Sequence, residues 1–218
     1  LNSDLIFRSS DFVNDELTKR IRLYVETPLL KFAKEGLDKN NFVIITGEPG
    51  VGKTTLAEML TYEYLKEDYH LLYISSDIKD AEIFLKNDDS KQVIYFDDFL
   101  GENAMEINKA QGNESALVSL VRRIKNKTNK KLVFTTRTFI LNTVLEQSDK
   151  LKRLNIKADQ TVFNLDEYSL EIKNQVLLNH IDESEISEEL KNIISKEELF
   201  QFITKHKNFT PRSVEFIT

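Results

Sequence analysis

The sequence contains no cysteine and no tryptophan, and it has only three prolines and three histidines among its 218 residues. Without cysteine the chain can form neither disulfide bonds nor thiolate metal sites, which fits a reducing cytoplasm. The histidines, His70, His180 and His206, are too scattered to predict a metal site. No apolar run approaches the length of a membrane span, and no secretory signal is evident. We therefore expect a cytoplasmic location and no membrane partner.

The chain is acidic overall, with a formal net charge of −6. This balance argues against a surface that binds nucleic acid over its whole extent, although a local basic patch would be compatible with it. One basic run extends from Arg122 to Lys131. We interpret it as the solvated end of a helix, because lysine and arginine suit the negative end of a helix dipole. Contact with nucleic acid phosphates is the alternative, so nucleic acid is a possible partner that the sequence does not itself indicate.

The two ends of the chain suggest that more sequence lies beyond them. The chain begins at Leu1, and it ends at Phe216-Ile217-Thr218, inside a segment whose pattern predicts a helix. Neither a glycine nor a capping residue closes that segment. We therefore expect the chain to be a fragment of a longer protein, with part of the function outside it.

The most informative motif is a glycine-rich loop that fits the pattern G-x-x-x-x-G-K-[ST]. It follows the apolar stretch Phe42–Thr46, which predicts a buried strand, and it precedes a helical pattern. In that setting the backbone N–H groups and the helix start can cradle a phosphate, and the lysine can reach the β- and γ-phosphates. The hydroxyl after the lysine would hold Mg²⁺. We therefore predict a nucleoside triphosphate site formed by Glu48, Pro49, Gly50, Val51, Gly52, Lys53, Thr54 and Thr55.

The order of apolar patterns predicts an α/β fold of the P-loop NTPase type. Helices separate five predicted strands, which implies a parallel sheet covered on both faces. From Ser169 onward only helical patterns occur, which predicts an all-helical lid. We expect a linker with a short helix over 1–26, a core over 27–167 and a lid over 168–218. The predicted strands are Phe42–Thr46, His70–Ile74, Val93–Phe96, Lys131–Thr135 and Gln160–Leu165.

Three helix predictions carry detail that a structure can test. Thr27 and Pro28 predict the start of a helix that runs to about Leu37, with Thr27 as N-cap and Pro28 at the first helical position. A short helix is predicted over Ala81–Leu85. The pattern from Leu141 to Leu154 predicts one continuous helix.

Two adjacent acids, Asp97 and Asp98, follow the third predicted strand. An acidic residue at the carboxyl end of such a strand lies beside the phosphate loop in a doubly wound sheet. We predict that Asp97 holds Mg²⁺ together with Thr54, mostly through water, and that Asp98 orients or deprotonates the attacking water. The alternative for Asp98 is that it only caps the turn that follows.

Arginines in two places could reach a phosphate of the nucleotide, and the first of them could sense the terminal one. The fourth strand ends in Thr135-Thr136-Arg137, and a guanidinium there matches phosphate oxygens in a bidentate fashion. In the lid, Pro211 could lie against an adenine ring and Arg212 could reach down to a phosphate. Each arginine could also be a solvated charge, and Thr210-Pro211 could be only a helix start.

Together, the segments Gly47–Thr55, Tyr95–Gly101 and Val133–Arg137 resemble a STAND-class NTPase, a relative of the AAA+ ATPases. More narrowly, Phe96–Gly101 and Asn208–Arg212 resemble the novel STAND NTPase 3 domain of bacterial multidomain proteins. The resemblance covers about Tyr24 to Thr218. It implies a slow, Mg²⁺-dependent ATPase that rests with ADP, exchanges it for ATP and then forms a homo-oligomer. It also implies effector and sensor domains outside this fragment, often in defence against phage.

The same resemblance assigns roles to single residues. Lys53 and Thr54 would hold phosphate and Mg²⁺, with Asp97 as the metal acid and Asp98 as the catalytic acid. Arg137 becomes the phosphate sensor, and Pro211 becomes the adenine contact. Val25 occupies the place of the family's adenine-side linker, without the Gly-Arg-Glu pattern of other STAND branches, and Arg212 resembles the second sensor arginine of AAA+ proteins.

Other functions stay open at this point. A AAA+ motor or loader that remodels protein or nucleic acid would need an arginine finger, for which Arg122 and Arg123 are the candidates. A small-molecule kinase lacks an obvious acceptor pocket in the sequence. A binding module without hydrolysis would hold nucleotide tightly and show no turnover.

Overall fold

A computed structural model gives the fold. It describes residues 15–74, 78, 81, 84–101, 114–154, 161–165 and 168–218.

The centre of the molecule is a five-stranded, fully parallel sheet with the order β2-β3-β4-β1-β5. Apolar, β-branched and aromatic residues fill its central strands, which are buried along almost their whole length. β4 is inserted between β1 and β3, so the strand before the phosphate loop and the strand before the acidic pair both lie next to it. The sequence predicted all five strands to within two residues at each end. Their bounds are β1 Phe42–Gly47, β2 His70–Ile74, β3 Gln92–Phe96, β4 Lys130–Arg137 and β5 Val162–Leu165.

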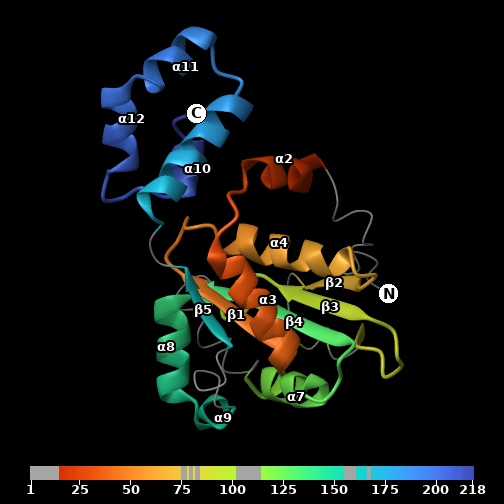
Figure 1. Ribbon diagram of the computed structural model, residues 1–218. Helices are drawn as coiled ribbons and strands as arrows, with labels where there is room; N and C mark the ends of the chain where they lie inside the picture. The colour runs from red at the N-terminus through yellow and green to blue at the C-terminus, as the bar shows by residue number, and fades with distance from the viewer. Residues whose placement is uncertain are drawn as a thin grey trace.

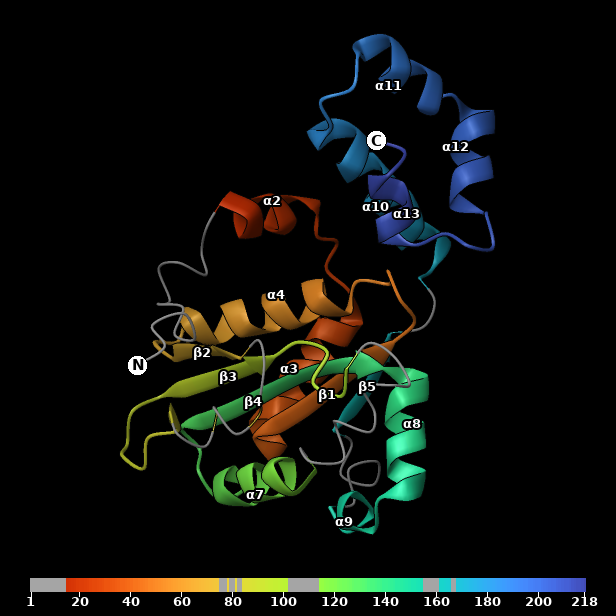
Figure 2. The same cartoon turned by 180° about the vertical axis from the view of Figure 1, so that it is seen from behind.

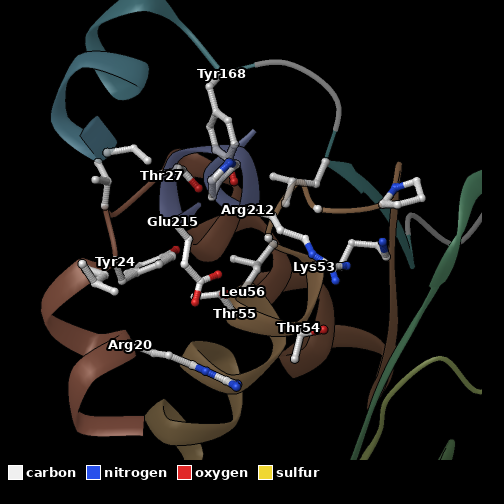
Figure 3. Close-up of a pocket in the computed structure, with 18 of the residues that line it drawn as sticks. Arg20, Tyr24, Thr27, Lys53, Thr54, Thr55, Leu56, Tyr168, Arg212 and Glu215 are labelled. Carbon is white, nitrogen blue, oxygen red and sulfur yellow. The ribbon is translucent and has the colours of Figure 1, made fainter. Parts of the chain in front are cut away.

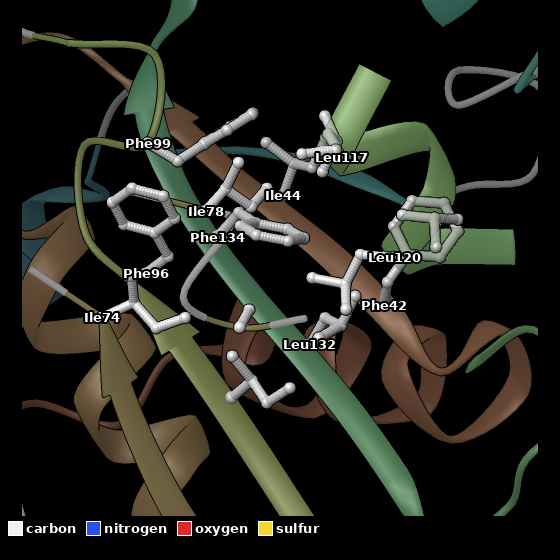
Figure 4. Packing of buried hydrophobic residues seen from close by; sticks show 14 of the residues in the cluster. Phe42, Ile44, Ile74, Ile78, Phe96, Phe99, Leu117, Leu120, Leu132 and Phe134 are labelled. Carbon is white, nitrogen blue, oxygen red and sulfur yellow. The ribbon is translucent and has the colours of Figure 1, made fainter. Parts of the chain in front are cut away.

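Helices cover both faces of the sheet (Figure 1). Alternate residues of each strand point to opposite faces, so Val43 and Ile45 of β1 pack with one helix layer and Phe42 and Ile44 with the other. Figure 4 shows the second of these cores, in which Phe99 packs on Phe134 with 4.9 Å between the ring centroids. The first layer is α3 Pro28–Asn40 and α4 Lys53–Leu65; the second is α7 Glu114–Ile124, α8 Thr138–Gln147 and α9 Asp149–Lys152.

Four helices after β5 form a separate cluster, which we call the lid. It has its own apolar core, centred on Leu177 and Val214, and it lies at the end of the molecule opposite to α7 and α9 (Figure 1 and Figure 2). α2 Asp15–Leu23 lies between the lid and α4. None of the described helices is long and apolar enough to cross a membrane. The lid helices are α10 Leu170–Glu183, α11 Glu188–Ile194, α12 Glu197–Thr204 and α13 Pro211–Glu215.

Several local predictions were wrong. Thr27 is the N-cap of α3 and Pro28 its first residue, as predicted, but the Thr27 hydroxyl makes no capping hydrogen bond, and α3 continues past the predicted end at Leu37 to Asn40. The predicted helix over 141–154 is two helices, since the buried Ser148 leaves the helical conformation and caps α9 through Leu151 N. The last helix ends at Glu215, so the terminal residues are not inside it. Ala81 and Phe84 are helical, and the other residues of that predicted helix, except Leu85, lie outside the described residues.

The basic run before β4 also differs from its interpretation. Lys125 is exposed, as a solvated helix end requires. Lys130 and Lys131, in contrast, are buried in β4. The ammonium group of Lys131 donates to the side chain of Asn41 at 2.9 Å and to the carbonyl of Leu37 at 3.2 Å. These bonds replace the water that the charge loses on burial.

Candidate nucleotide-binding site

The glycines of the loop between β1 and α4 let the backbone turn where other residues would clash. Gly50 has φ of +80° and Gly52 has φ of +95°, a region that side chains rarely adopt. A Cβ on Gly50 would lie 3.1 Å from the Cβ of Arg212, and one on Gly52 would lie 3.0 Å from the Tyr168 hydroxyl. Both glycines therefore serve the conformation of the loop and the close approach of other elements to it.

Lys53 opens α4 with its side chain folded back over the loop. Only 8% of the residue is exposed, and its Nζ donates a 3.0 Å hydrogen bond to the carbonyl oxygen of Glu48. Burial lowers the pKa of Lys53 below its ordinary value of 10.5, and the nearby carboxylate of Asp98 offsets part of this effect. A cation held in this way in a cavity is poised to gain from an anionic ligand, because the ligand would compensate its desolvation.

Asp97 lies directly after β3 and meets two hydroxyls. Thr54 Oγ1 donates to its carboxylate, at 3.2 Å from each oxygen, and Thr135 of β4 donates to Oδ1. Thr135 also accepts a 2.8 Å hydrogen bond from the backbone N–H of Asp98. The inserted strand β4 therefore fixes both acids at the carboxyl edge of the sheet. A carboxylate and a hydroxyl in contact are the oxygen donors that Mg²⁺ takes, so these residues fit that ion.

A cavity of about 430 Å³ extends from the loop toward the lid. Figure 3 shows Lys53, Arg212, Tyr24 and Thr27 pointing into it from the core, the lid and the segment before α3. Asp98 and Arg137 line its wall as well, which brings the second acid and the arginine that ends β4 into one site. The volume and the mixed polar and apolar lining are typical of pockets for small ligands.

The end of the cavity around Tyr24 and Thr27 is formed by the segment after α2 and by the lid (Figure 3). Val25, Val176 and Pro211 give it apolar walls. Tyr24 and Thr27 contribute hydroxyl oxygens that are buried and make no hydrogen bond. Burial raises the pKa of Tyr24 above its ordinary value. This end of the cavity combines apolar surface with two unused polar groups.

Among the described residues, two hydrogen bonds attach the lid and the segment that leads into it to the phosphate loop. The hydroxyl of Tyr168, just before α10, donates to the carbonyl of Val51 at 2.6 Å. The backbone N–H of Arg212, in α13, donates to the carbonyl of Gly50 at 3.4 Å. A capping box between Thr210 and Ser213 holds the start of α13 in place. The loop that would bind phosphate is therefore also the surface on which the lid rests.

α2 connects the core with the lid on the other side of the cavity. Arg20 lines the cavity and forms an ion pair with Glu58 of α4. Arg22 pairs with Glu183 of α10 at 3.6 Å, and the side chain of Asn179 donates to the carbonyl of Leu23 at 3.3 Å. The short helix thus contacts both bodies that enclose the cavity.

The structure gathers the residues that the sequence singled out. Three of them do not line the cavity: Glu48 and Val51 act through their carbonyl groups, and Asp97 contacts Thr54. Sequence reasoning missed further lining residues, because they lie on a short helix or are single polar side chains and so belong to no motif. The predicted residues that line it are Val25, Pro49, Gly50, Gly52, Lys53, Thr54, Thr55, Asp98, Arg137, Pro211 and Arg212; the missed ones include Arg20, Tyr24, Thr27, Tyr168, His180 and Glu215.

A parallel sheet with this strand order, the glycine-rich loop, an acid after β3 and a helical lid define a P-loop NTPase of the AAA+-like class. Residues 24–183 match the model of one family, Novel STAND NTPase 3. The chain belongs to that family and is therefore a nucleotide-binding NTPase module. A search of curated protein sequences gives no match.

Solved structures support the same fold. Domain III of the Thermotoga maritima replication initiation protein DnaA has a TM-score of 0.58 and 18% identity, over 93% of this chain and 86% of that one. The replication initiator DnaA bound to AMPPCP and single-stranded DNA has a TM-score of 0.61 and 16% identity, over 94% of this chain and 64% of that one. A chain of the Escherichia coli MS115-1 HORMA:CdnC:Trip13 complex has a TM-score of 0.56 and 13% identity, over 94% of this chain and 90% of that one.

Proposed function

We propose that this chain is an ATP-binding, slowly hydrolysing STAND module that acts as a nucleotide-dependent switch. The observation that carries the proposal is the attachment of the lid to the phosphate loop through Tyr168 and Arg212. A ligand in this loop contacts a surface that is shared by core and lid. Its phosphates can therefore change the free energy of closure, which a switch requires.

The core would bind the phosphates of ATP or ADP. Backbone N–H groups of the loop from Glu48 to Gly52 would face the phosphate oxygens, and the Lys53 ammonium would leave the carbonyl of Glu48 to reach them. Thr54 and Asp97 would hold Mg²⁺, and Thr55 lies beside them in the cavity wall. When bound, Mg²⁺ would supply charge neutralisation at the β- and γ-phosphates.

Hydrolysis would depend on the two charged side chains at the end of the sheet. Asp98 would orient the attacking water and accept its proton, since the backbone at that residue is held by Thr135. Arg137 would contact the γ-phosphate, because it lines the cavity and its pair of N–H donors matches phosphate oxygens. We expect turnover to be slow, as the family resemblance implies.

The apolar end of the cavity would bind the base. Val25 and Pro211 would contact the adenine faces, and the hydroxyls of Tyr24 and Thr27 are the polar groups at hand for its edge. Adenine is favoured because structures of DnaA, with which the chain shares its fold, hold an ATP analogue. Arg212 would approach the phosphates from the lid.

We further propose that exchange of ADP for ATP drives homo-oligomerisation, under control of effector and sensor domains outside this chain, in bacterial antiviral defence in the cytoplasm. A AAA+ motor or loader is the second candidate. Arg122 and Arg123 lie outside the nucleotide cavity, on a helix surface where a finger offered to a neighbouring subunit would have to be. The motor reading predicts rapid turnover that requires these arginines.

The first test is the nucleotide carried by the freshly purified chain, released by denaturation and identified by ion-pair chromatography. A switch at rest predicts stoichiometric ADP. An empty site that binds ATP and turns it over freely would favour the motor. Failure to bind either nucleotide with Mg²⁺ present would refute both readings.

Three variants then separate the roles of the site residues. Lys53→Met is expected to abolish nucleotide binding, and Asp97→Asn to remove the Mg²⁺ dependence of affinity. Asp98→Asn is expected to bind ATP normally and to lose most of the turnover. If Asp98→Asn hydrolyses ATP like the original chain, its role is limited to capping the turn. Asp68→Asn, in the turn after α4, provides a matched control outside the cavity.

A further inference from the structure

A second pocket, of about 600 Å³, lies between α7 and α9 and shares no residue with the nucleotide cavity. We call it the basic groove. Four of its lining residues are cationic, namely Arg122, Arg123, Lys150 and Arg153, and the others are two serines and a valine. Among the residues that the structure describes, no carboxylate lines it. The groove is therefore strongly positive, although the chain as a whole has a net charge of −6.

The cations of the groove come from two helices that are fixed against each other. Lys150 of α9 donates a 2.8 Å hydrogen bond to Ser115 Oγ at the start of α7. Near the C-terminal end of α7, Arg123 donates to the side chain of Asn87 at 3.2 Å, which holds that end of the helix in place. Arg122, Lys150 and Arg153 are exposed, and none of them forms an ion pair with a described residue. The nearby acid Asp149 is instead paired with Lys152 at 3.2 Å.

The positive charge extends along the helix rather than ending at one point. Ser115, Ser119 and Arg122 recur on one face of α7 and cover about 10 Å at a rise of about 1.5 Å per residue. Lys125, which is exposed, continues the line past the end of α7. A line of arginines and hydroxyls suits a strand of phosphates, because guanidinium groups bind phosphate oxygens in a bidentate fashion and hydroxyls donate to them.

We propose that the basic groove binds the phosphodiester backbone of single-stranded nucleic acid. The described residues that line the groove offer charge and hydroxyl donors but no aromatic side chain, so the binding is independent of sequence. The groove lies on the helices farthest from the lid, so a strand bound there leaves the nucleotide cavity open (Figure 1). Binding would be a property of this chain additional to its nucleotide switch.

The test is fluorescence anisotropy of a labelled oligothymidylate of about 20 nucleotides with the 218-residue chain, over a series of salt concentrations. Four phosphate contacts predict a slope of about −3 for the logarithm of the binding constant against the logarithm of salt concentration. The double variant Arg122→Gln/Lys150→Gln is expected to bind about tenfold more weakly and to halve that slope. An oligouridylate should behave alike, since the backbone charge is the same.

The double variant Lys31→Gln/Lys39→Gln is the matched control, because it removes the same charge from exposed positions on α3. It should bind like the original chain. Equal weakening in both double variants would overturn the proposal, as would the absence of binding at low salt. Tighter binding of polyglutamate than of the oligonucleotides would likewise overturn it, in favour of an acidic protein partner. Thermal melting of each variant separates lost binding from lost folding, and only a small change is expected, because these side chains are exposed and the Lys150–Ser115 hydrogen bond lies at the surface.

Discussion

The hydroxyl of Tyr168 lies 2.6 Å from the carbonyl oxygen of Val51, so a residue at the entrance to the lid is bonded to the middle of the phosphate loop. We predict that Tyr168→Phe lowers the free energy of unfolding by about 1 kcal/mol and accelerates ADP release about fivefold, because one such bond is worth about 1 kcal/mol. Release of a fluorescent ADP analogue measures the rate. Tyr62→Phe, which lies outside the cavity, should leave the rate of ADP release unchanged. Equal rates of release in the two variants would show that the Tyr168 hydroxyl does not hold the lid closed.

A second prediction concerns the unused hydroxyl of Thr27. Thr27→Val removes a buried oxygen that makes no hydrogen bond, so the nucleotide-free protein should become slightly more stable. If that oxygen binds the base, the affinity for ATP should fall about threefold to tenfold at the same time. Calorimetric titration measures the expected fall in ATP affinity, and thermal melting measures the expected gain in stability.

Thr61→Val is the matched control for this variant. Thr61 also has a buried hydroxyl without a hydrogen bond, but it lies within α4 and does not line the cavity. The Thr61→Val variant should gain stability without losing affinity for ATP. Unchanged affinity in Thr27→Val would show that the base lies elsewhere.

Gly50→Ala should loosen the lid. The new Cβ would have to adopt φ of +80° and would lie 3.1 Å from the Cβ of Arg212. We expect a loss of about 1–2 kcal/mol in stability and faster proteolytic cleavage near α13. In an Arg212→Gly background the same substitution should cost less, because the clash is gone and only the backbone strain is left. An identical cost in both backgrounds would mean that the lid does not rest on Gly50.

Stability should depend on pH in the alkaline range. Burial lowers the pKa values of Lys53 and Lys131 below 10.5, so between the folded pKa and 10.5 the unfolded chain binds more protons. The free energy of unfolding should therefore rise with pH in that window, by up to about 1.4 kcal/mol per pH unit for each lysine. Above pH 10.5 the contribution of the lysines is complete, and the free energy of unfolding should fall, since burial raises the pKa of Tyr95 well above 10.0 and only the unfolded tyrosine ionises.

Urea unfolding at a series of pH values measures this profile, and Lys53→Met should show a smaller rise than the original chain. A decline in stability from neutral pH upward would contradict the assignment of buried, charged lysines.

The sequence predicted the sheet well because its strands are short apolar runs between clear helical patterns. Val93–Phe96 is an example, since continuous burial on both faces leaves no polar residue to confuse the pattern. The predictions that failed depended on tertiary contacts. Ser148 ends α8 because it is buried and caps α9, and Lys131 is buried because Asn41 and Leu37 offer it acceptors. Neither set of partners is visible from local sequence.

The candidate site divides in the same way. The loop residues and Asp97 follow from a motif whose spacing reflects the geometry of phosphate binding. Tyr168 and Thr27 belong to no motif, and they reach the cavity only because β5 and α3 place them there. The sequence predicts Thr135 at the end of the fourth strand, but its bond to Asp97 depends on the order of the strands in the sheet.

That strand order also determines when the site can form during synthesis of the chain. β1 pairs only with β4 and β5 among the described strands, and both are made long after the phosphate loop has left the ribosome. A nascent chain that stops before Lys130 contains the whole loop with no neighbouring strand to support it. The chain should therefore bind nucleotide only after β1 has paired with β4 and β5, and nucleotide should not assist that pairing. Truncated products of translation should not compete for nucleotide.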